Sequence, residues 1–159
     1  MNIQKPYRAT HSYNQILDAV PDQVFPLLCP VRELDWVPGW NPLTVWSAAG
    51  VAEREAIFTT LDSGDQAIWV VSHFDPNAFR IEFVKVIPRR TVTVIRVALH
   101  AHSDSRTMAA VEYSVTALSE EGEKVVSTFS DDYYVRFMQE WERALNHFLT
   151  TGEKIEPDA

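Results

Sequence analysis

The sequence has a single cysteine, Cys29, among its 159 residues, so no disulfide can form within the chain. A lone thiol suits a reducing compartment. No stretch approaches the roughly 18 consecutive apolar residues that a membrane-spanning helix needs. The first residues lack the apolar run and small-residue cleavage site of a signal peptide. We therefore expect a cytoplasmic protein without a membrane span.

Basic residues are also scarce, with 14 Lys and Arg against 22 Asp and Glu and a formal net charge of -8. Binding to a phosphate backbone needs clustered Lys and Arg that displace counterions. The one basic cluster, Lys85 with Arg89 and Arg90, falls at an expected turn between strands. We therefore expect no nucleic-acid partner, and the composition leaves open whether the protein is a monomer or a homodimer.

The apolar residues that are present, 46% of the chain, suffice for one buried core without disulfides or a structural metal. We find no repeat, linker or low-complexity tract. We expect one domain over residues 1–159, with a frayed tail over 151–159.

Extended segments dominate the first three quarters of the chain. Alternating apolar and polar residues, interrupted at turn-like positions, predict strands over 8–19, 43–48, 53–61, 66–74, 78–87, 90–101 and 106–118. The short connections between the last six predict an antiparallel meander. Ile95, Val97 and Leu99 alternate with Arg96 and His100, so one sheet face is apolar and the other is wet. Segment 66–74 is apolar on both sides, which leaves Trp69 and His73 without a predicted orientation.

Three helical segments interrupt or follow these strands. Pro21 with Asp22 predicts a helix start, and Pro26 predicts that this helix is short or kinked. Residues 32–36 form a second short helical turn. Ser130, followed by two aspartates, caps a long helix with an apolar stripe that ends at Gly152. Residues 119–128 are expected to form either a separate helical turn or the start of that long helix. Gly122 disfavours a helix in this segment.

Several stretches resemble a known superfamily. They are LDAVPDQVF (17–25), CPVRELDWVPGW (29–40), WVVSHFDP (69–76), RIEFVKVIP (80–88) and WERALNHFLTTG (141–152). Together they resemble the START-type helix-grip (SRPBCC) superfamily, in a bacterial branch labelled polyketide cyclase/dehydrase or lipid-transport-like. Val20 departs from the pattern, because many relatives carry proline there. The resemblance implies an α+β fold in which a curved seven-stranded antiparallel sheet surrounds a long C-terminal helix, with two short helices after the first strand.

The resemblance also implies a mostly apolar cavity between sheet and helix, which in relatives binds lipids, steroids, hormones or polyketides. We place around it the aromatic and apolar residues that can face inward: Trp36, Trp40, Phe58, Ile81, Phe83, Val97, Tyr113, Tyr134, Met138 and Trp141. His11 and Thr60 are candidate polar groups of the cavity. No catalytic residue is assigned.

The segment CPVRELDWVPGW allows two interpretations. Cys29 could be a nucleophile, or the segment could be a lid over the cavity. A reactive thiol needs a lowered pKa, whereas Cys29 follows a short helix at the end where the dipole disfavours a thiolate. We interpret Cys29 as a buried anchor and Trp36 and Trp40 as residues at the cavity mouth.

Metal binding has one candidate arrangement. His100 and His102 lie on one face of a strand, and Glu112 on a neighbouring strand could complete a zinc site. That face is the polar one, where such histidines are common without metal. We expect no metal and no cofactor.

Three hypotheses for function follow. The first is binding of a hydrophobic small molecule that is lipid-like, isoprenoid or an aromatic polyketide. The second is a cyclase or dehydratase that uses the same cavity, which requires a titratable group that points inward. The third is an interaction module with a filled core. Whether the protein is an enzyme stays open at this stage, because fold does not determine function.

Overall fold

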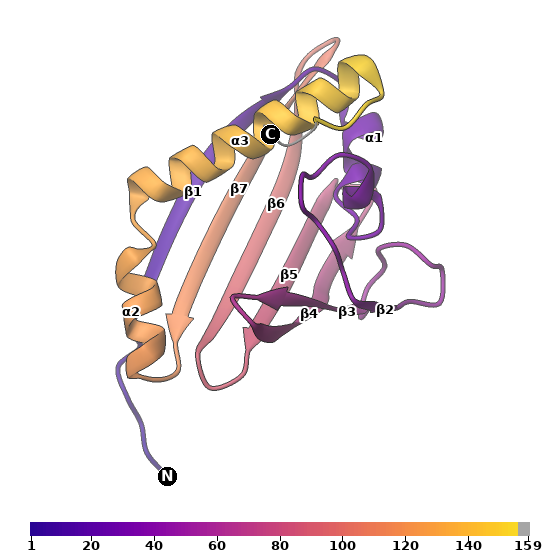
Figure 1. Cartoon of the computed structure of the whole chain (residues 1–159). Helices are drawn as coiled ribbons and strands as arrows, with labels where there is room; N and C mark the ends of the chain where they lie inside the picture. The colour runs from indigo at the N-terminus through magenta and orange to yellow at the C-terminus, as the bar shows by residue number, and fades with distance from the viewer. Residues whose placement is uncertain (156–159) are drawn as a thin grey trace.

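The computed structural model describes residues 1–155 (Figure 1). Within them the strands are β1 (Arg8–Leu17), β2 (Thr44–Trp46), β3 (Ile57–Asp62), β4 (Asp65–Asp75), β5 (Arg80–Ile87), β6 (Thr91–Ser103) and β7 (Arg106–Ala117). The helical segments are α1 (Pro21–Val24), η1 (Phe25–Leu27), η2 (Arg32–Asp35), α2 (Glu120–Thr128) and α3 (Asp131–Thr151). No helix in this part of the chain is long and apolar enough to cross a bilayer.

The strands form one antiparallel sheet in the order β1-β7-β6-β5-β4-β3-β2. Short turns join the consecutive strands from β3 to β7, and the loop 47–56 joins β2 to β3, so β2 to β7 lie side by side as a meander, and β1 joins the free edge of β7. Figure 1 shows α3 crossing this end of the sheet, with the short helices near its C-terminal end and β2 and β3 curling forward at the far edge. The predicted fold class is confirmed.

The two faces of the sheet differ as the alternation predicts. In β6, Ile95, Val97 and Leu99 are buried, whereas Arg96 and His100 are exposed. This confirms the predicted apolar face and places it under α3.

Strand β4 shows why its faces could not be predicted. Trp69 and Val71 point to the inner face, and then the register shifts between Val71 and His73. This bulge adds one residue, so Phe74 also packs inside, against the ring of Phe25 at 5.5 Å. His73 lies on the exposed outer face.

Helix α3 is positioned by its ends and by one buried tyrosine. The hydroxyl of Ser130 accepts the Tyr133 backbone N–H at 3.2 Å, and Gly152 ends the helix with φ +74°. Tyr134, Met138 and Leu145 are fully buried against the sheet. The Tyr134 hydroxyl donates to a carbonyl of β7 at 2.7 Å, which anchors the N-terminal half of α3.

Helix α2 is a separate helix, which decides between the two alternatives for residues 119–128. Ser119 caps it by accepting the Gly122 backbone N–H at 3.2 Å. Gly122 packs directly on the turn between β5 and β6, where an added Cβ would lie 1.9 Å from the backbone carbonyl oxygen of Arg90. The glycine is therefore required for close packing rather than for a break in the helix.

The start of β3 differs from the prediction. Residues 53–56 are not part of β3, because the Glu53 carboxylate accepts hydrogen bonds from the Ser47 hydroxyl and from backbone N–H groups and so holds a loop. At the C-terminus, α3 ends at Thr151 with Gly152 as its cap, and Ile155 packs against the hydrophobic core. Fraying of the tail stays a prediction, and residues 156–159 lie outside the described residues.

Candidate functional site

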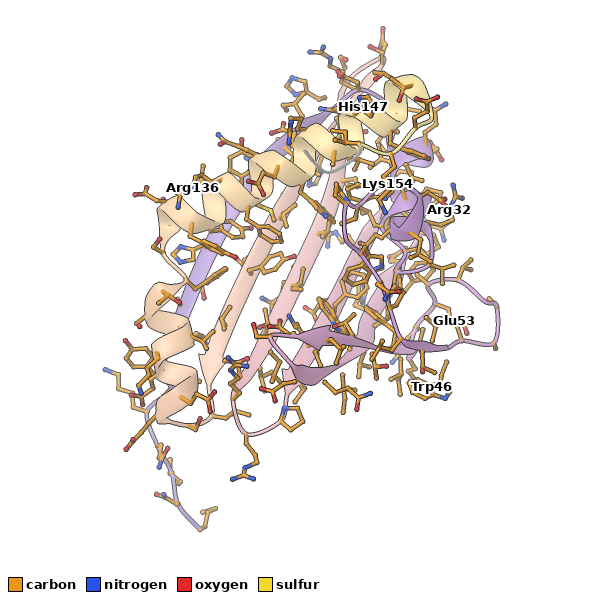
Figure 2. The ribbon with its side chains drawn as sticks, in the orientation of Figure 1. Arg32, Trp46, Glu53, Arg136, His147 and Lys154 are labelled. Carbon is orange, nitrogen blue, oxygen red and sulfur yellow. The ribbon has the colours of Figure 1, made fainter. Side chains whose placement is uncertain are left out.

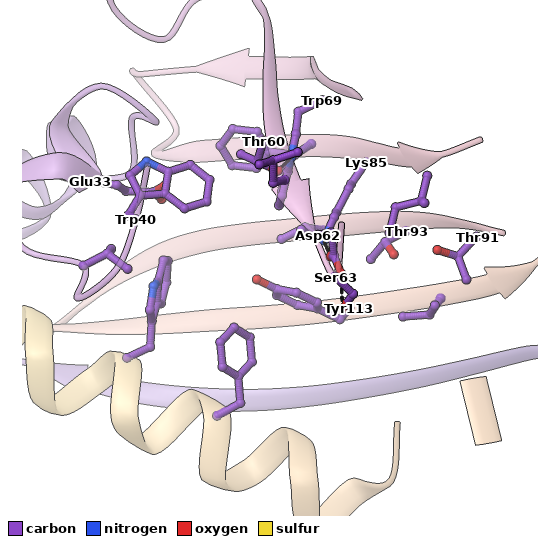
Figure 3. A pocket seen from close by; sticks show the side chains of 18 of the residues that line it. Glu33, Trp40, Thr60, Asp62, Ser63, Trp69, Lys85, Thr91, Thr93 and Tyr113 are labelled. Carbon is purple, nitrogen blue, oxygen red and sulfur yellow. Dashed lines mark hydrogen bonds and ion pairs between the residues drawn. The ribbon is translucent and has the colours of Figure 1, made fainter. Parts of the chain in front are cut away.

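A cavity of about 880 Å³ lies between the inner face of the sheet, helices α2 and α3, and the segment 28–43. Its volume falls within the roughly 300–1,000 Å³ typical of small-molecule pockets. Strands β3 to β7 form the floor, and the segment 28–43 covers one end (Figure 3).

Four aromatic rings form a continuous wall of the cavity. Phe58 and Trp69 are stacked, with ring centroids 5.1 Å apart and planes at 16°. Trp40 makes edge-to-face contacts with both rings at centroid distances of 6.0 and 5.9 Å. Phe83 does the same at 6.2 and 6.4 Å. Such offset and edge-to-face contacts hold the rings in place and leave flat faces for a guest.

Trp40 is positioned by the covering segment itself. Its indole N–H donates to the Pro30 carbonyl at 2.7 Å, and Gly39 before it has φ +73°, a conformation that favours glycine. The side chain of Trp69 is fixed similarly, since its N–H donates to the Thr60 hydroxyl at 2.9 Å. Both indoles therefore have satisfied N–H groups and line the cavity with their rings.

The structure brings part of the predicted set together. The residues of that set that line the cavity are Trp40, Phe58, Phe83, Val97, Tyr113, Trp141 and Thr60. Their role as ligand contacts stays a prediction.

The other predicted residues lie behind this wall. Trp36 is fully buried, donates its N–H to the Leu27 carbonyl at 3.0 Å and packs on Trp141 at 5.0 Å, so it supports the covering segment instead of facing the mouth. Tyr134, Met138 and Ile81 fill the core between helix and sheet and do not line the cavity.

His11 is likewise not a cavity residue. Its Nε2 lies 2.7 Å from the Phe129 carbonyl oxygen, and its Nδ1 lies 3.3 Å from the Asp131 carboxylate. The ring also stacks on Tyr134 at 5.7 Å. His11 thus ties β1 to the junction of α2 and α3.

One carboxyl group faces this cavity without a partner from the chain. Glu33, in η2, lines the wall beside Trp40 (Figure 3). Burial alone raises its pKa from 4.5 to about 8, and no hydrogen bond or cation within the described residues offsets that effect. At neutral pH the group is mostly a neutral carboxylic acid that gains or loses its proton near physiological pH.

Tyr113, on β7, lies across from Glu33. Figure 3 shows its hydroxyl pointing into the cavity toward the end where Glu33 and Trp40 lie. Burial raises the pKa of Tyr113, and the charges of Glu33 and Tyr134 raise it further. The phenol therefore stays protonated and can both donate and accept a hydrogen bond.

The opposite end of the cavity is polar but internally compensated. Lys85 forms an ion pair with Asp62 and also lies over the ring of Trp69 at 5.0 Å. Burial raises the pKa of Asp62, but the hydrogen bond and charge of Lys85 outweigh it and lower the pKa. Arg90 pairs with Asp65 at 2.8 Å. The cations at this end are thus already neutralised.

Cys29 is buried and outside the cavity wall. Its Sγ accepts the backbone N–H of Ala52 at 3.0 Å, which links the base of the covering segment to the loop before β3. This contact supports the anchor interpretation rather than the nucleophile.

The zinc arrangement is not assembled. In the β6–β7 register Glu112 lies opposite Arg96 and pairs with it at 2.8 Å, whereas His100 lies opposite Met108. Glu112 is thus four residues along the strand from His100. Among residues 1–155 no group of three or more His, Cys, Asp or Glu side chains could hold a metal ion.

Sequence inspection missed Glu33 and Trp69 as wall residues. Glu33 sits in a charged stretch, R-E-L-D, that suggests a solvated turn, and the one signal of its inward position is Trp36, three residues later on the same face of a helical turn. Trp69 was ambiguous because its strand is apolar on both sides.

The fold of the chain can be compared with solved structures. Norcoclaurine synthase from Thalictrum flavum superposes with a TM-score of 0.68 at 9% identity, over 92% of this chain and 88% of that one. A hypothetical protein from Helicobacter pylori gives 0.68 at 12% identity, over 88% and 87%. Ara h 8.0201 gives 0.61 at 10% identity, over 91% and 99%.

The chain has the helix-grip fold. This likeness, at such low identity, concerns the fold alone. No protein-family model matches the sequence, and no curated protein matches it. The helix-grip cavity of this chain must therefore be interpreted from its own residues.

Proposed function

We propose that this helix-grip protein binds a hydrophobic small molecule with an aromatic portion in the cavity between sheet and α3. The observation that carries the proposal is the cavity of about 880 Å³ with its wall of Trp40, Phe58, Trp69 and Phe83. A void of this size lined by apolar rings is costly to leave to water, and filling it removes apolar surface from solvent.

The aromatic wall favours a flat guest over a flexible chain. A planar ring can pack against the aromatic side chains that line the cavity without ordering many rotatable bonds, whereas a long acyl chain loses that freedom on binding. Among the lipid-like, isoprenoid and aromatic polyketide classes, the wall therefore suits an aromatic polyketide best.

The solved structures support the proposal only in a general way. Norcoclaurine synthase shows that a helix-grip protein can carry out small-molecule chemistry. Neither that likeness nor the fold gives the ligand of this chain.

Native mass spectrometry and tryptophan fluorescence test the proposal. We expect gently purified protein to carry a small-molecule mass, and the neutral probe 2-(2-naphthyl)ethanol to bind one per chain and quench the indole emission of the wall. Absence of any guest mass together with no saturable quenching by the probe would reject it. Trp46, the last residue of β2, is 55% exposed (Figure 2), and the variant Trp46→Ala reports nonspecific surface binding.

A second candidate function is an enzyme of the cyclase or dehydratase type. Such an enzyme needs an inward-facing proton acceptor, and Glu33 beside the Tyr113 hydroxyl meets this requirement. Glu33 would take a proton from the carbon next to a ketone while Tyr113 donates a hydrogen bond to the oxygen that becomes an enolate.

Proton exchange separates the enzyme from the binder. The aryl ketone 2-tetralone in D₂O should exchange its α-protons faster with the wild-type protein than with Glu33→Gln, as followed by NMR. Equal rates for both proteins would leave binding alone as the function. The third hypothesis, an interaction module with a filled core, is disfavoured by the size of the cavity.

A further inference from the structure

Glu33 is the feature of the cavity that the binding of a purely apolar guest does not explain. Its half-buried side chain lines the wall between the covering segment and Tyr113, and removal from water is the one influence that raises its pKa. Buried carboxylates in proteins are normally paired with a cation or hydrogen-bonded. A strongly perturbed acid in a cleft is a candidate functional group.

The chain itself does not supply the missing cation. On η2, Arg32 pairs with Asp35 on the outer surface at 2.8 Å. Lys154 donates to the Leu34 carbonyl at 3.2 Å. Both cations are therefore bonded to groups other than the Glu33 carboxylate.

The cations within the cavity are also occupied. Lys85 is paired with Asp62, and Arg90 with Asp65. Across the cavity the titratable group that faces Glu33 is Tyr113, whose pKa is raised and which therefore stays neutral. Among residues 1–155 no cation pairs with Glu33, so a positive charge beside its ionised form would come from a ligand.

We propose that the ligand of this cavity carries a protonated amine beside its aromatic body, and that Glu33 is the counter-ion of that amine. This inference rests on the proposed binding function and names the chemical class of its ligand. The ammonium would lie between the Glu33 carboxylate and the Tyr113 hydroxyl oxygen, which can accept a hydrogen bond.

The surroundings of Glu33 favour a cation. The ring of Trp40 lies beside it, and an aromatic face attracts a cation through its quadrupole, most strongly for tryptophan. The net charge of -8 also raises the local concentration of positively charged ligands over anionic ones. Carboxylate, indole and phenol together form a site for an aromatic amine.

Proton linkage gives the inference a sharp signature. With a pKa of about 8, Glu33 holds its proton in most molecules at pH 7, and an ammonium ion binds only the ionised form. Binding should therefore release close to one proton per ligand at pH 7. The amine affinity should rise about tenfold between pH 7 and pH 9, because an alkyl amine with a pKa of about 10 keeps its charge over that range.

The experiment compares 2-(2-naphthyl)ethylamine with 2-(2-naphthyl)ethanol, which differ in one group and in charge. Isothermal titration in phosphate and in Tris buffer measures the proton released, since the two buffers differ in ionisation enthalpy. We expect the amine to bind at least tenfold tighter than the alcohol at pH 9. In Glu33→Gln the preference, the pH dependence and the proton release should disappear, while the alcohol still binds within threefold of wild type.

The variant Asp35→Asn is the matched control, because it removes an exposed carboxylate from the same short helix. It should leave every measured quantity unchanged. An amine that binds no tighter than the alcohol, or a pH dependence that survives in Glu33→Gln, overturns the inference while the binding function stands. Failure of both probes overturns the binding function as well.

Discussion

Replacement of Glu33 by glutamine should remove a pH-dependent loss of stability. The folded protein raises the pKa of Glu33 from 4.5 to about 8, so the folded state holds this proton more tightly than the unfolded chain does. Between these two values unfolding releases a proton, and stability therefore falls as pH rises from about 4.5 to 8. Below pH 4.5 Glu33 lowers the free energy of unfolding only slightly, and above pH 8 it lowers it by the full amount.

The magnitude follows from the two pKa values. Since each pH unit is worth about 1.4 kcal/mol, the difference between 4.5 and about 8 sets an upper bound of about 5 kcal/mol on the penalty at pH 9. Water that enters the cavity lowers this figure, because the carboxyl keeps part of its surface there. We expect about 2–4 kcal/mol, which is a large share of the stability of a domain of this size.

Urea unfolding followed by tryptophan fluorescence at pH 5, 7 and 9 measures this difference. Wild-type protein should lose stability from pH 5 to pH 9 by more than Glu33→Gln does, so the variant becomes the more stable protein at pH 9. Subtracting the pH profile of Glu33→Gln from that of the wild type cancels the contribution of every other group that titrates in both proteins. Parallel pH profiles for the two proteins would refute the assignment of a buried, unpaired carboxyl, and Asp35→Asn should follow the wild-type profile.

Four further substitutions test the packing around the cavity. Trp40→Ala should weaken binding of 2-(2-naphthyl)ethanol at least tenfold by fluorescence titration, whereas Cys29→Ser should keep it within twofold; the opposite result would restore the thiol as the functional group. Gly122→Ala should lower the free energy of unfolding by about 2 kcal/mol or more in urea, because its Cβ would meet the Arg90 carbonyl, and a neutral effect would mean that α2 can shift. Tyr134→Phe should cost about 1–3 kcal/mol by leaving a buried strand carbonyl unpaired, with no loss of probe binding; reduced binding at unchanged stability would place the hydroxyl in the cavity.

Local patterns in the sequence were sufficient for the fold. The apolar stripe and Ser130 cap of α3, and the alternation along β6 and β7, reflect the periodicity of helices and strands and do not depend on distant contacts. The cavity itself was expected from the family resemblance, and Trp40, Phe58 and Phe83 of its wall were placed there as aromatic residues able to face inward. Gly122, in contrast, looked like a helix breaker because local propensity takes no account of the carbonyl that packs on it.

The tertiary structure decided which inward-facing side chains line the cavity and which pack against other side chains in the core. Trp36 and Trp40 lie four residues apart in one segment, yet one is sealed against Trp141 and the other faces the cavity. The packing of the sheet decided which face of β4 is the inner one and so placed Trp69 in the wall. The path of the covering segment brings the half-buried Glu33 into the cavity, where no cation among residues 1–155 pairs with it. The periodicity of the chain determines the face of an element on which a residue lies, but the volume opposite that face is set by how separate elements pack, and so is the ionisation of any charge enclosed there.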